Sequence, residues 1–406
     1  MHAIDSFVGN HQHANSLSHR ACPVCGRTAH SDVLQLSDFQ FFTDSATVPK
    51  RVNLQQVQCR HCLTLFQNPC FTEQGFAQLF AEAGMSYGST TLRPVEQSEW
   101  LNVRQLLQPG TVLLDVGCYE GHFLSQLPDH LVLQGVDIDA QAIARGRARQ
   151  PSLELVHSAF DRFALSRPPQ VITMFHVLEH LPDPVAVLRR LREVSSDDAR
   201  LVVEVPVLEW GGTNDINGFF SVQHITHFSR QTLVNALALG GWQLQEACKI
   251  EGYNGYRVLA TKADQPCAAG SIEAGHTGDV AALHEVLRRW YEAQQAVESK
   301  LTTLDGQQQI VVWGAGLHTE FLYQCTNLFR TAQRRFVLVD SDTLKQGRSW
   351  RGIAIHAPGT LADVDWSQTH MVISSYGGQP AIAQAARQLG VPAQRILALY
   401  DEVNVY

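Results

Sequence analysis

Short apolar runs alternate with amphipathic stretches through the middle of the chain. The runs TVLLDVG (111–117), LVLQGVDI (131–138), QVITMFHV (170–177) and ARLVVEVPV (199–207) are each followed by a turn or a helical pattern. Runs of this length and composition are typical of buried strands. Because strands that alternate with helices form parallel sheets covered by helices, the pattern predicts an α/β domain.

A second block near the C-terminus repeats this alternation. Its strand-like runs are QQIVVWGAG (308–316), RRFVLVDSD (334–342) and HMVISSYGG (370–378). A long helical pattern at 280–304 precedes it, with apolar residues every three or four positions. This helix either mediates dimerisation or packs on its own domain, and fewer than four heptads favour packing.

Two breaks in composition divide the chain. AGMSYGSTTLRP (83–94) and ADQPCAAGSIEAGHTG (263–278) are rich in glycine, proline and small residues and have no periodicity. We therefore expect a small module at 1–85, an α/β domain at 86–262, a linker at 263–278, and a helix with a second α/β domain at 279–406.

Composition narrows the class of protein. Of the 406 residues, 45% are hydrophobic and 17% are charged, as in soluble globular proteins. The formal net charge of −8 disfavours a nucleic-acid partner, which would need a basic face. No apolar run is long enough to span a membrane, and the N-terminus does not resemble a secretory signal. We expect a cytoplasmic protein, either a monomer or a homodimer.

Four cysteines stand in two C-x2-C pairs, Cys22 with Cys25 and Cys59 with Cys62. Each tight turn can offer two thiolates to a tetrahedral zinc ion. Disulfides are the alternative, but reducing conditions in the cytosol disfavour them. The 33 residues between the pairs exceed the usual zinc-ribbon spacing, so an insertion should lie there. Four thiolates would close the coordination shell, which predicts a structural Zn²⁺.

The strand at 111–117 ends in a glycine-bearing loop. Asp115 and Gly117 close the strand, and Gly121 is expected to open a helix whose N-terminus favours negative charge. The next strand ends in GVDID, which places Asp137 where a carboxylate can accept hydrogen bonds from both ribose hydroxyls. The spacing D-x-G-x-x-x-G differs from the dinucleotide G-x-G-x-x-G, so these residues favour a nucleoside ligand.

Together, DVGCYEG, GVDID and MFHVLEHLPDP resemble the class I S-adenosylmethionine (SAM) methyltransferases over roughly residues 90–262. The resemblance implies a Rossmann-like parallel sheet and SAM as the cofactor. It places the methionine end against Asp115, Gly117 and Gly121, the ribose at Asp137, the adenine at Ile138, and the border of the site at Phe175 and His176.

The order of the three blocks resembles the three-domain sugar C-methyltransferases, which act on nucleotide-linked keto-deoxysugars. That resemblance extends over nearly the whole chain and implies a C-terminal Rossmann-like domain that frames the substrate cleft. In the loop VVWGAGLHTEF, Thr319 stands where a dinucleotide fingerprint has its third glycine. A structural or substrate-framing role is therefore favoured over NAD binding.

The stretch FFSVQHITHFSR (219–230) matches the catalytic segment of that family. The match places the family's catalytic histidine at His224 and its second active-site histidine at His180. Ser221 and Gln223 replace the family's tyrosine and glutamate, and glutamine supplies no negative charge. C-methylation beside a ketone needs a base and a donor for the enolate, so we expect His224 as the base and His180, His227 or Tyr87 as the donor.

Further residues are expected beside the substrate. In YNGYRVLAT (253–261), Asn254 is a candidate for a sugar hydroxyl and Arg257 for a diphosphate. Gln223 and His227 are also expected at the substrate, whereas a metal on His224 and His227 lacks an obvious carboxylate ligand. Three alternatives remain: an O-methyltransferase for a sugar or small molecule, an RNA methyltransferase, and a SAM-binding scaffold without catalysis.

Overall fold

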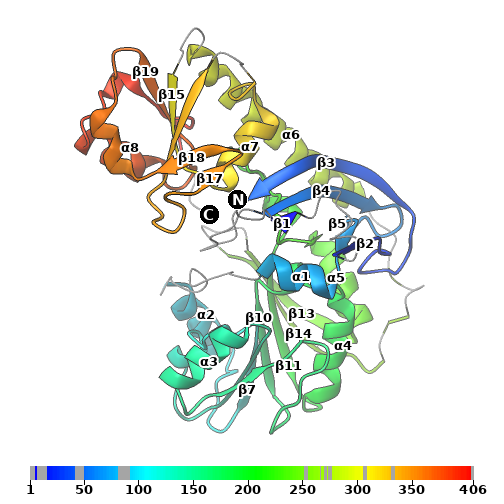
Figure 1. The fold of residues 1–406 in the computed structure, drawn as a ribbon. Coiled ribbons are helices and arrows are strands. Elements are labelled where there is room, and N and C mark those ends of the chain that lie inside the picture. Colours follow the sequence, from blue (N-terminus) through cyan, green and yellow to red (C-terminus); the bar gives the residue numbers. More distant parts are fainter. Residues whose placement is uncertain are drawn as a thin grey trace.

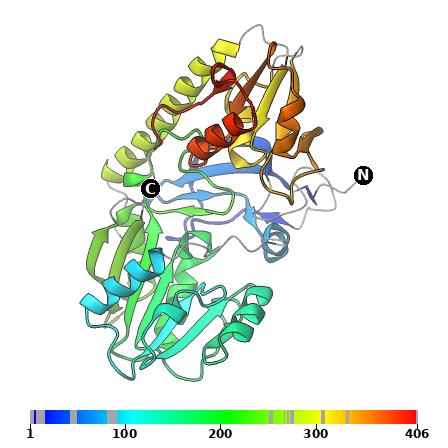
Figure 2. The same cartoon turned by 90° about the vertical axis from the view of Figure 1, so that its left-hand side faces the viewer.

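The computed structural model describes residues 5–6, 16–41, 50–80, 92–250, 255–265, 267–268, 272, 277–304, 309–330 and 334–403. The central domain and the C-terminal domain lie at opposite ends of the molecule, with the N-terminal module between them (Figure 1). The view turned by 90° shows the same order (Figure 2). In the described residues, no helix is both long enough and apolar enough to cross a membrane.

The N-terminal module is built on a long hairpin. Strand β3 (His30–Phe41) pairs antiparallel with β4 (Lys50–Cys59), and this hairpin is the insertion expected between the two cysteine pairs. The other elements are β1 (Asp5–Ser6), β2 (Leu17–Ser18), β5 (Leu65–Gln67), β6 (Cys70–Phe71) and α1 (Glu73–Phe80).

The central domain contains a seven-stranded sheet in the order β13-β14-β11-β10-β7-β8-β9. Its neighbours pair in parallel except at β14, which runs antiparallel to both β11 and β13. The strands are β7 (Val112–Val116), β8 (Val132–Asp137), β9 (Glu154–His157), β10 (Val171–Phe175), β11 (Arg200–Pro206), β13 (Trp242–Lys249) and β14 (Gly255–Lys262). The apolar runs predicted as strands are therefore strands of an α/β sheet.

Helices cover this sheet. They are α2 (Leu92–Val103), α3 (Ala140–Arg149), α4 (Pro184–Val194) and α5 (Arg230–Leu239), with short 3-10 helices η2 (Leu124–Gln126), η3 (Leu178–His180) and η4 (Leu208–Trp210). The carboxylate of Asp183 accepts a hydrogen bond from the Ala186 N–H at the start of α4. Ser229 and Thr232 form a reciprocal capping box at the start of α5, which satisfies two backbone donors there.

The expected helix after Gly121 is not present. Residues 119–123 form turns, and between β7 and β8, where every residue is described, the only helical element is the three-residue η2. Pro128 lies two residues after the end of η2, and a proline at this position cannot continue a helix. The prediction that Gly121 opens a helix is therefore wrong.

One short strand of the central region belongs to the N-terminal sheet. Strand β12 (Thr226–His227) lies inside the histidine-bearing stretch and pairs antiparallel with β5. On its other side, Phe228 bridges to Val207, the residue after β11. The stretch 219–230 is thus held between two sheets.

The C-terminal domain contains a six-stranded sheet in the order β17-β18-β16-β15-β19-β20, parallel except for β17. Its elements are β15 (Gln309–Trp313), α7 (Leu317–Cys325), β16 (Arg335–Val339), β17 (Ser349–Trp350), β18 (Ile353–His356), η7 (Pro358–Asp363), β19 (Thr369–Ile373), α8 (Gln379–Gln388), η8 (Ala393–Arg395) and β20 (Ile396–Leu397).

The long helix α6 (Thr277–Leu301), continued by η6 (Thr302–Leu304), joins the parts of the molecule. Its apolar face enters a core shared with β3, β4, α7 and residues 216–225. Trp290 donates from Nε1 to the Ile216 carbonyl at 2.6 Å and packs against Phe220 with ring centroids 5.2 Å apart. The helix therefore packs within the chain, as the short heptad pattern favours, and it does so across domains.

Candidate active site

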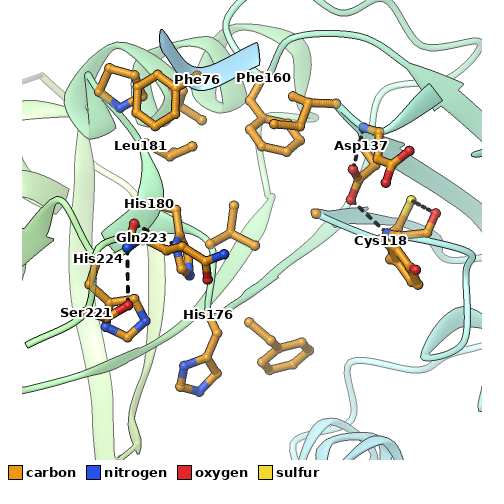
Figure 3. A pocket seen from close by; sticks show the side chains of 18 of the residues that line it. Phe76, Cys118, Asp137, Phe160, His176, His180, Leu181, Ser221, Gln223 and His224 are labelled. Carbon is orange, nitrogen blue, oxygen red and sulfur yellow. Dashed lines mark hydrogen bonds between the residues drawn. The ribbon is translucent and has the colours of Figure 1, made fainter. Parts of the chain in front are cut away.

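A single cleft of about 1910 Å³ runs from the carboxyl ends of the central strands to the C-terminal domain. The N-terminal module lines it with Phe71 and Phe76, and the C-terminal domain contributes Leu317. Figure 3 shows Asp137 and Cys118 on one side of this cleft and His176, His180 and His224 on the other. In parallel α/β sheets, ligands bind at this end of the strands.

The loop after β7 brings the backbone close to the cleft. Gly117 lines it with φ +78°, a region that favours glycine, and a Cβ there would lie 2.3 Å from Val177 Cγ2. Asp115 also lines the cleft, and its Oδ1 accepts a 2.7 Å hydrogen bond from Thr173 Oγ1. Burial raises the pKa of Asp115 to about 7.

The end of β8 presents a carboxylate next to an exposed apolar side chain. Asp137 Oδ2 accepts from the Tyr119 N–H and Oδ1 from the Asp139 N–H, both at 2.8 Å. These bonds orient the carboxylate at the cleft wall, where its remaining lone pairs can accept ribose hydroxyls. Ile138, 46% exposed, lies in the cleft lining beside it, as packing against a planar base requires.

Gly121, the second glycine of this loop, packs against the domain core. It has φ +80°, and a Cβ there would approach Leu153 Cδ1 to 3.0 Å and Leu155 to 3.5 Å. The residue is not among those that line the cleft in the described part of the chain. Because Gly121 has no side chain, the loop can pack closely on Leu153 and Leu155, away from the cleft lining.

At the end of β10, a histidine lies between two buried carboxylates. Phe175 and His176 line the cleft, and His176 has φ +56°. Its Nε2 lies 2.9 Å from Glu204 Oε1 and its Nδ1 lies 3.2 Å from Glu179 Oε1. Burial by itself would lower the pKa of His176, but these two carboxylates raise it.

Three side chains next to His176 form a compact group at the cleft. One ligand-type atom from each of Glu179, His180 and His224 lies within 4.8 Å of the others. His180 Nδ1 is 2.9 Å from the Gln223 carbonyl oxygen, and its Nε2 is 3.8 Å from Glu179 Oε1. The rings of His180 and His224 meet edge-on, with centroids 4.8 Å apart.

Burial and charge set the protonation of this group. Burial would raise the pKa of Glu179, but His176, His180 and His224 lower it to about 2. Burial of the ring, with the neighbouring His180, lowers the pKa of His224 to about 3. At neutral pH the structure therefore holds a buried carboxylate beside a neutral imidazole.

The other residues of the histidine stretch divide into two groups. Ser221 and Gln223 line the cleft, and the Gln223 N–H donates to Ser221 Oγ at 3.2 Å. His227 is only 2% exposed, packs between Phe219 and Phe220, and is not among the cleft-lining residues described. The prediction that His227 contacts the substrate is wrong, because its ring is buried in an aromatic environment.

Arg257 also lies away from the ligand space. Its side chain is fully buried, with Nε donating to Glu204 Oε2 at 2.7 Å and Nη1 to Glu96 Oε1 at 2.7 Å. The predicted contact with a diphosphate is therefore wrong, since both carboxylates already occupy the guanidinium. Tyr87 and Asn254, the remaining candidates, lie outside the described residues.

The four cysteines converge as their spacing predicts. Their sulfur atoms lie within 4.8 Å of one another, with Cys22 and Cys62 at 3.6 Å and Cys25 and Cys59 at 3.5 Å. A tetrahedral zinc site with bonds of about 2.3 Å has sulfur–sulfur edges of about 3.8 Å. The group therefore has the donor type, burial and spacing that suit zinc.

The glycine loop of the C-terminal domain approaches the cleft through Leu317. Its Ala315 N–H donates to Asp340 Oδ2 at 2.7 Å, so the strand-end acid holds the loop itself. Thr319 is buried, and its hydroxyl donates to the Gly314 carbonyl at 2.7 Å. Asp340 and Thr319 thus have structural partners within the domain.

Residues 102–247 match the family model of the methyltransferase domain. The chain contains a methyltransferase domain of the SAM-dependent class. Its central domain has the class I, Rossmann-like fold that DVGCYEG, GVDID and MFHVLEHLPDP predict, and the parallel-containing C-terminal sheet forms the second α/β domain. No curated protein matches the sequence.

Similar solved structures cover about half of the chain. One is a 1,6-didemethyltoxoflavin-N1-methyltransferase from Burkholderia thailandensis, with 15% identity, 50% of this chain and 96% of that chain covered, and a TM-score of 0.40. The magnesium protoporphyrin IX methyltransferase of Synechocystis PCC 6803 has 16% identity, 47% and 95% coverage, and a TM-score of 0.36. A SAM-dependent methyltransferase from Clostridium acetobutylicum ATCC 824 has 10% identity, 47% and 98% coverage, and a TM-score of 0.37.

Sequence reasoning missed the two buried acids of the site. Glu179 stands within the LEH motif and Glu204 on β11, and both contact His176. The sequence did offer a signal for Glu179, because this residue stands three positions after His176 and directly before His180. Glu204 gave no such signal, because its partners come from other strands and from α2.

Proposed function

We propose that the enzyme methylates a nucleotide-activated keto-deoxysugar at carbon, with His224 as the general base. The observation that carries the proposal is the shared cleft, where the Asp137–Ile138 wall faces the His180–His224 pair. At about 1910 Å³ the cleft exceeds the ~300–1,000 Å³ of common small-molecule sites, so it has space for a second large ligand beside the cofactor.

The chemistry assigns distinct tasks to the two histidines. Bound SAM supplies an activated methyl group, and the protein has to align the acceptor with it. His224, a neutral imidazole at the cleft wall, is positioned to take the proton from the carbon next to the ketone. His180 lies beside it and is the candidate donor to the enolate oxygen. The products are the C-methylated sugar, S-adenosylhomocysteine and the proton left on His224.

The flanking parts have supporting roles in this proposal. The C-terminal domain frames the acceptor end of the cleft through Leu317. A structural Zn²⁺ on Cys22, Cys25, Cys59 and Cys62 holds the N-terminal module, whose β5 pairs with β12. The division into four segments expected from composition, 1–85, 86–262, 263–278 and 279–406, is kept in this proposal. The setting is cytoplasmic synthesis of a polysaccharide or a glycosylated metabolite, by a monomer or homodimer.

One observation favours O-methylation of a sugar or small molecule as a second candidate. The described cleft lining holds two arginines, Arg93 and Arg162, and both already contact carboxylates. A diphosphate would need to displace these partners. O-methylation needs only one base near a hydroxyl, which His224 also supplies.

Two further alternatives have less support. An RNA acceptor would need a basic surface, whereas carboxylates outnumber arginines in the described cleft lining. A scaffold without catalysis would not need the ordered Glu179–His180–His224 group. Methylation of structured RNA, or SAM binding with no acceptor in a broad panel, would support these alternatives respectively.

The test is to identify the atom that receives the methyl group. The enzyme is incubated with carbon-13 methyl-labelled SAM and a panel of nucleotide-linked sugars, both 4-keto-6-deoxy and fully hydroxylated, and NMR gives the shift of the labelled carbon. A carbon-bound methyl appearing only with keto-sugars is the expected result. An oxygen-bound methyl would replace the proposal with the O-methylation alternative.

A further inference from the structure

We infer that Asp215 binds a hydroxyl group of the methyl acceptor, and that Tyr400 of the C-terminal domain holds Asp215 in position for this task. The inference deepens the proposed function, and it rests on that proposal for the choice of a sugar hydroxyl as the bound group. It gives the C-terminal domain a defined part in acceptor binding, beyond the contribution of Leu317 to the cleft lining.

Asp215 belongs to a segment that leads into the histidine stretch and lines the same cleft. Most residues between Asp215 and His224 contribute to the cleft lining. The backbone of this segment is held by α6, since Trp290 Nε1 donates to the Ile216 carbonyl at 2.6 Å. The carboxylate therefore stands on the same supported segment as the proposed base.

The Asp215 carboxylate is buried without a cation beside it. The residue is 5% exposed, and no lysine or arginine pairs with it in the part of the chain that the structure describes. His318 Nε2 lies 4.0 Å from Oδ1, but burial lowers the pKa of His318 to about 3, so this ring is neutral at pH 7. Burial raises the pKa of Asp215 to about 6, and at neutral pH the group is still mainly a carboxylate. A negative charge at this point repels a phosphate and suits a hydroxyl donor.

One oxygen of this carboxylate is bound by the protein and the other is available. Oδ1 accepts from the Asn217 N–H at 3.0 Å and from the Tyr400 hydroxyl at 3.4 Å. Among the described residues, none donates a hydrogen bond to Oδ2. A buried carboxylate oxygen without a donor is costly. Its presence in a cleft therefore indicates a ligand that supplies the donor.

Tyr400 connects this carboxylate to the C-terminal domain. Its hydroxyl accepts from the Ile216 N–H at 3.1 Å and lies 2.6 Å from His318 Nε2. His318 is fixed in turn by Ser374, whose Oγ lies 3.0 Å from Nδ1. Because all of these side chains are buried, the C-terminal domain can orient Asp215 with little freedom of movement.

Calorimetry with uridine diphosphate glucose, in the presence of S-adenosylhomocysteine, measures acceptor binding without methyl transfer. Asp215→Asn should weaken this binding by about tenfold or more, because a hydrogen bond to a charged group is lost. Analogues that each lack one hydroxyl, from the hexose or from the ribose, identify the bound group. The analogue without that hydroxyl should bind equally to the wild type and to Asp215→Asn, and its identity distinguishes the hexose from the ribose.

Three measurements separate binding from folding. Asp215→Asn keeps the shape of the side chain and removes an uncompensated buried charge, so its melting temperature should be at least that of the wild type. Asp198→Asn, at an exposed position just before β11 and outside the described cleft lining, should bind as the wild type does. Tyr400→Phe should weaken binding of uridine diphosphate glucose in the wild type and have no further effect in the Asp215→Asn background.

Unchanged affinity in Asp215→Asn, an equal loss for every analogue, or a lowered melting temperature would overturn the inference. Tighter binding of uridine diphosphate glucosamine would overturn it as well, because an ammonium group would then be the preferred ligand. A methyl group found on oxygen, with the dependence on Asp215 intact, would contradict the proposed C-methylation and leave the inference standing. Absence of binding by all of these compounds would contradict both.

Discussion

Two histidines three positions apart in one apolar stretch have opposite environments. His227 is buried among phenylalanines, and burial lowers its pKa to about 3. His224 borders the cleft beside His180 and Glu179. In the pattern FFSVQHITHFSR the two are indistinguishable, because a two-residue strand, β12, decides which ring faces inwards.

Replacement of His224 should separate catalysis from cofactor binding. His224→Ala removes the proposed base, so turnover should fall by about 10²–10⁴-fold or more. SAM affinity should stay near the wild-type value, because Asp115, Gly117 and Asp137 are untouched. Calorimetry with SAM and a methyl-transfer assay measure the two quantities. Near-normal turnover, or loss of SAM binding, would contradict the role of His224.

Replacement of Arg257 should act on stability. Arg257→Met leaves Glu204 buried with less compensation and should cost about 3–5 kcal/mol in the free energy of unfolding. Denaturant unfolding measures this loss, and the double variant with Glu204→Gln should lose less than the sum of the single changes. A raised KM for the acceptor with an unchanged free energy of unfolding would instead support a contact between Arg257 and the substrate.

At the residue scale, the sequence could place a side chain at the cleft where that residue stands at the end of a strand. Asp137, Ile138 and Gly117 come to the cleft because strand ends in a parallel sheet share one edge. Arg257 could not be placed from sequence, since its partners Glu96 and Glu204 lie on α2 and β11. An arginine in a strand looks the same whether it meets a phosphate or a buried acid.

At the scale of elements, the pairing of β5 with β12 connects the cysteine module to the active site. Arg20 strengthens this connection, since its Nη2 donates to the Ile225 carbonyl at 2.7 Å and its Nη1 to the Pro182 carbonyl at 2.8 Å. The Gln67 N–H also donates to the Ile225 carbonyl at 2.9 Å. The module thus supports the histidine stretch through its backbone.

Loss of the proposed zinc should therefore impair turnover more than SAM binding. Elemental analysis should find about one zinc per chain, as expected for one four-cysteine site, and Cys59→Ser with Cys62→Ser should remove it. The same variant should lower the melting temperature and the methyl-transfer rate while the β7–β8 site still binds SAM. Cys248→Ser, outside the cluster, is the control. Full zinc content in the double variant would exclude this site.

Prediction at this scale depended on the length of the pattern. The five-residue strands β7, β10 and β15 were readable from their apolar runs. The β3–β4 hairpin was foreseen only as an insertion, and β12 was not foreseen, because two residues carry no periodicity. The helix expected at Gly121 failed because the glycine there serves close packing on Leu153 and Leu155.

At the scale of the whole molecule, α6 connects parts that the sequence places far apart. Its residue Trp290 contacts Phe220 at the cleft and approaches Phe321 on α7, with ring centroids 6.3 Å apart. Residues 214–216 add polar contacts. Tyr376 Oη donates to Asn214 Oδ1, and Tyr400 Oη donates to Asp215 Oδ1 at 3.4 Å. The Ile216 N–H donates to Tyr400 Oη at 3.1 Å. The C-terminal domain therefore contacts residues 214–216, which lie just before the histidine stretch at 219–230.

Truncation of Trp290 should weaken the packing of α6 against Phe220 and Phe321. Trp290→Ala removes a side chain that is 8% exposed and should cost about 3–5 kcal/mol of stability. The neighbouring Tyr291 is 61% exposed, so Tyr291→Ala should change stability by no more than about 0.5 kcal/mol. Thermal and denaturant unfolding compare the two. Equal losses of stability in the two variants would mean that the packing of α6 does not depend on Trp290.

The position of β12 between two sheets has a consequence for how the enzyme can change over evolutionary time. A recombination event that exchanged the central domain alone would carry the proposed SAM-binding loop intact into a new protein. It would leave behind β5, Arg20 and α6, which hold the other wall of the cleft. Under the proposed function, cofactor binding could therefore be transferred with the central domain alone, whereas acceptor chemistry would require all three parts of the chain.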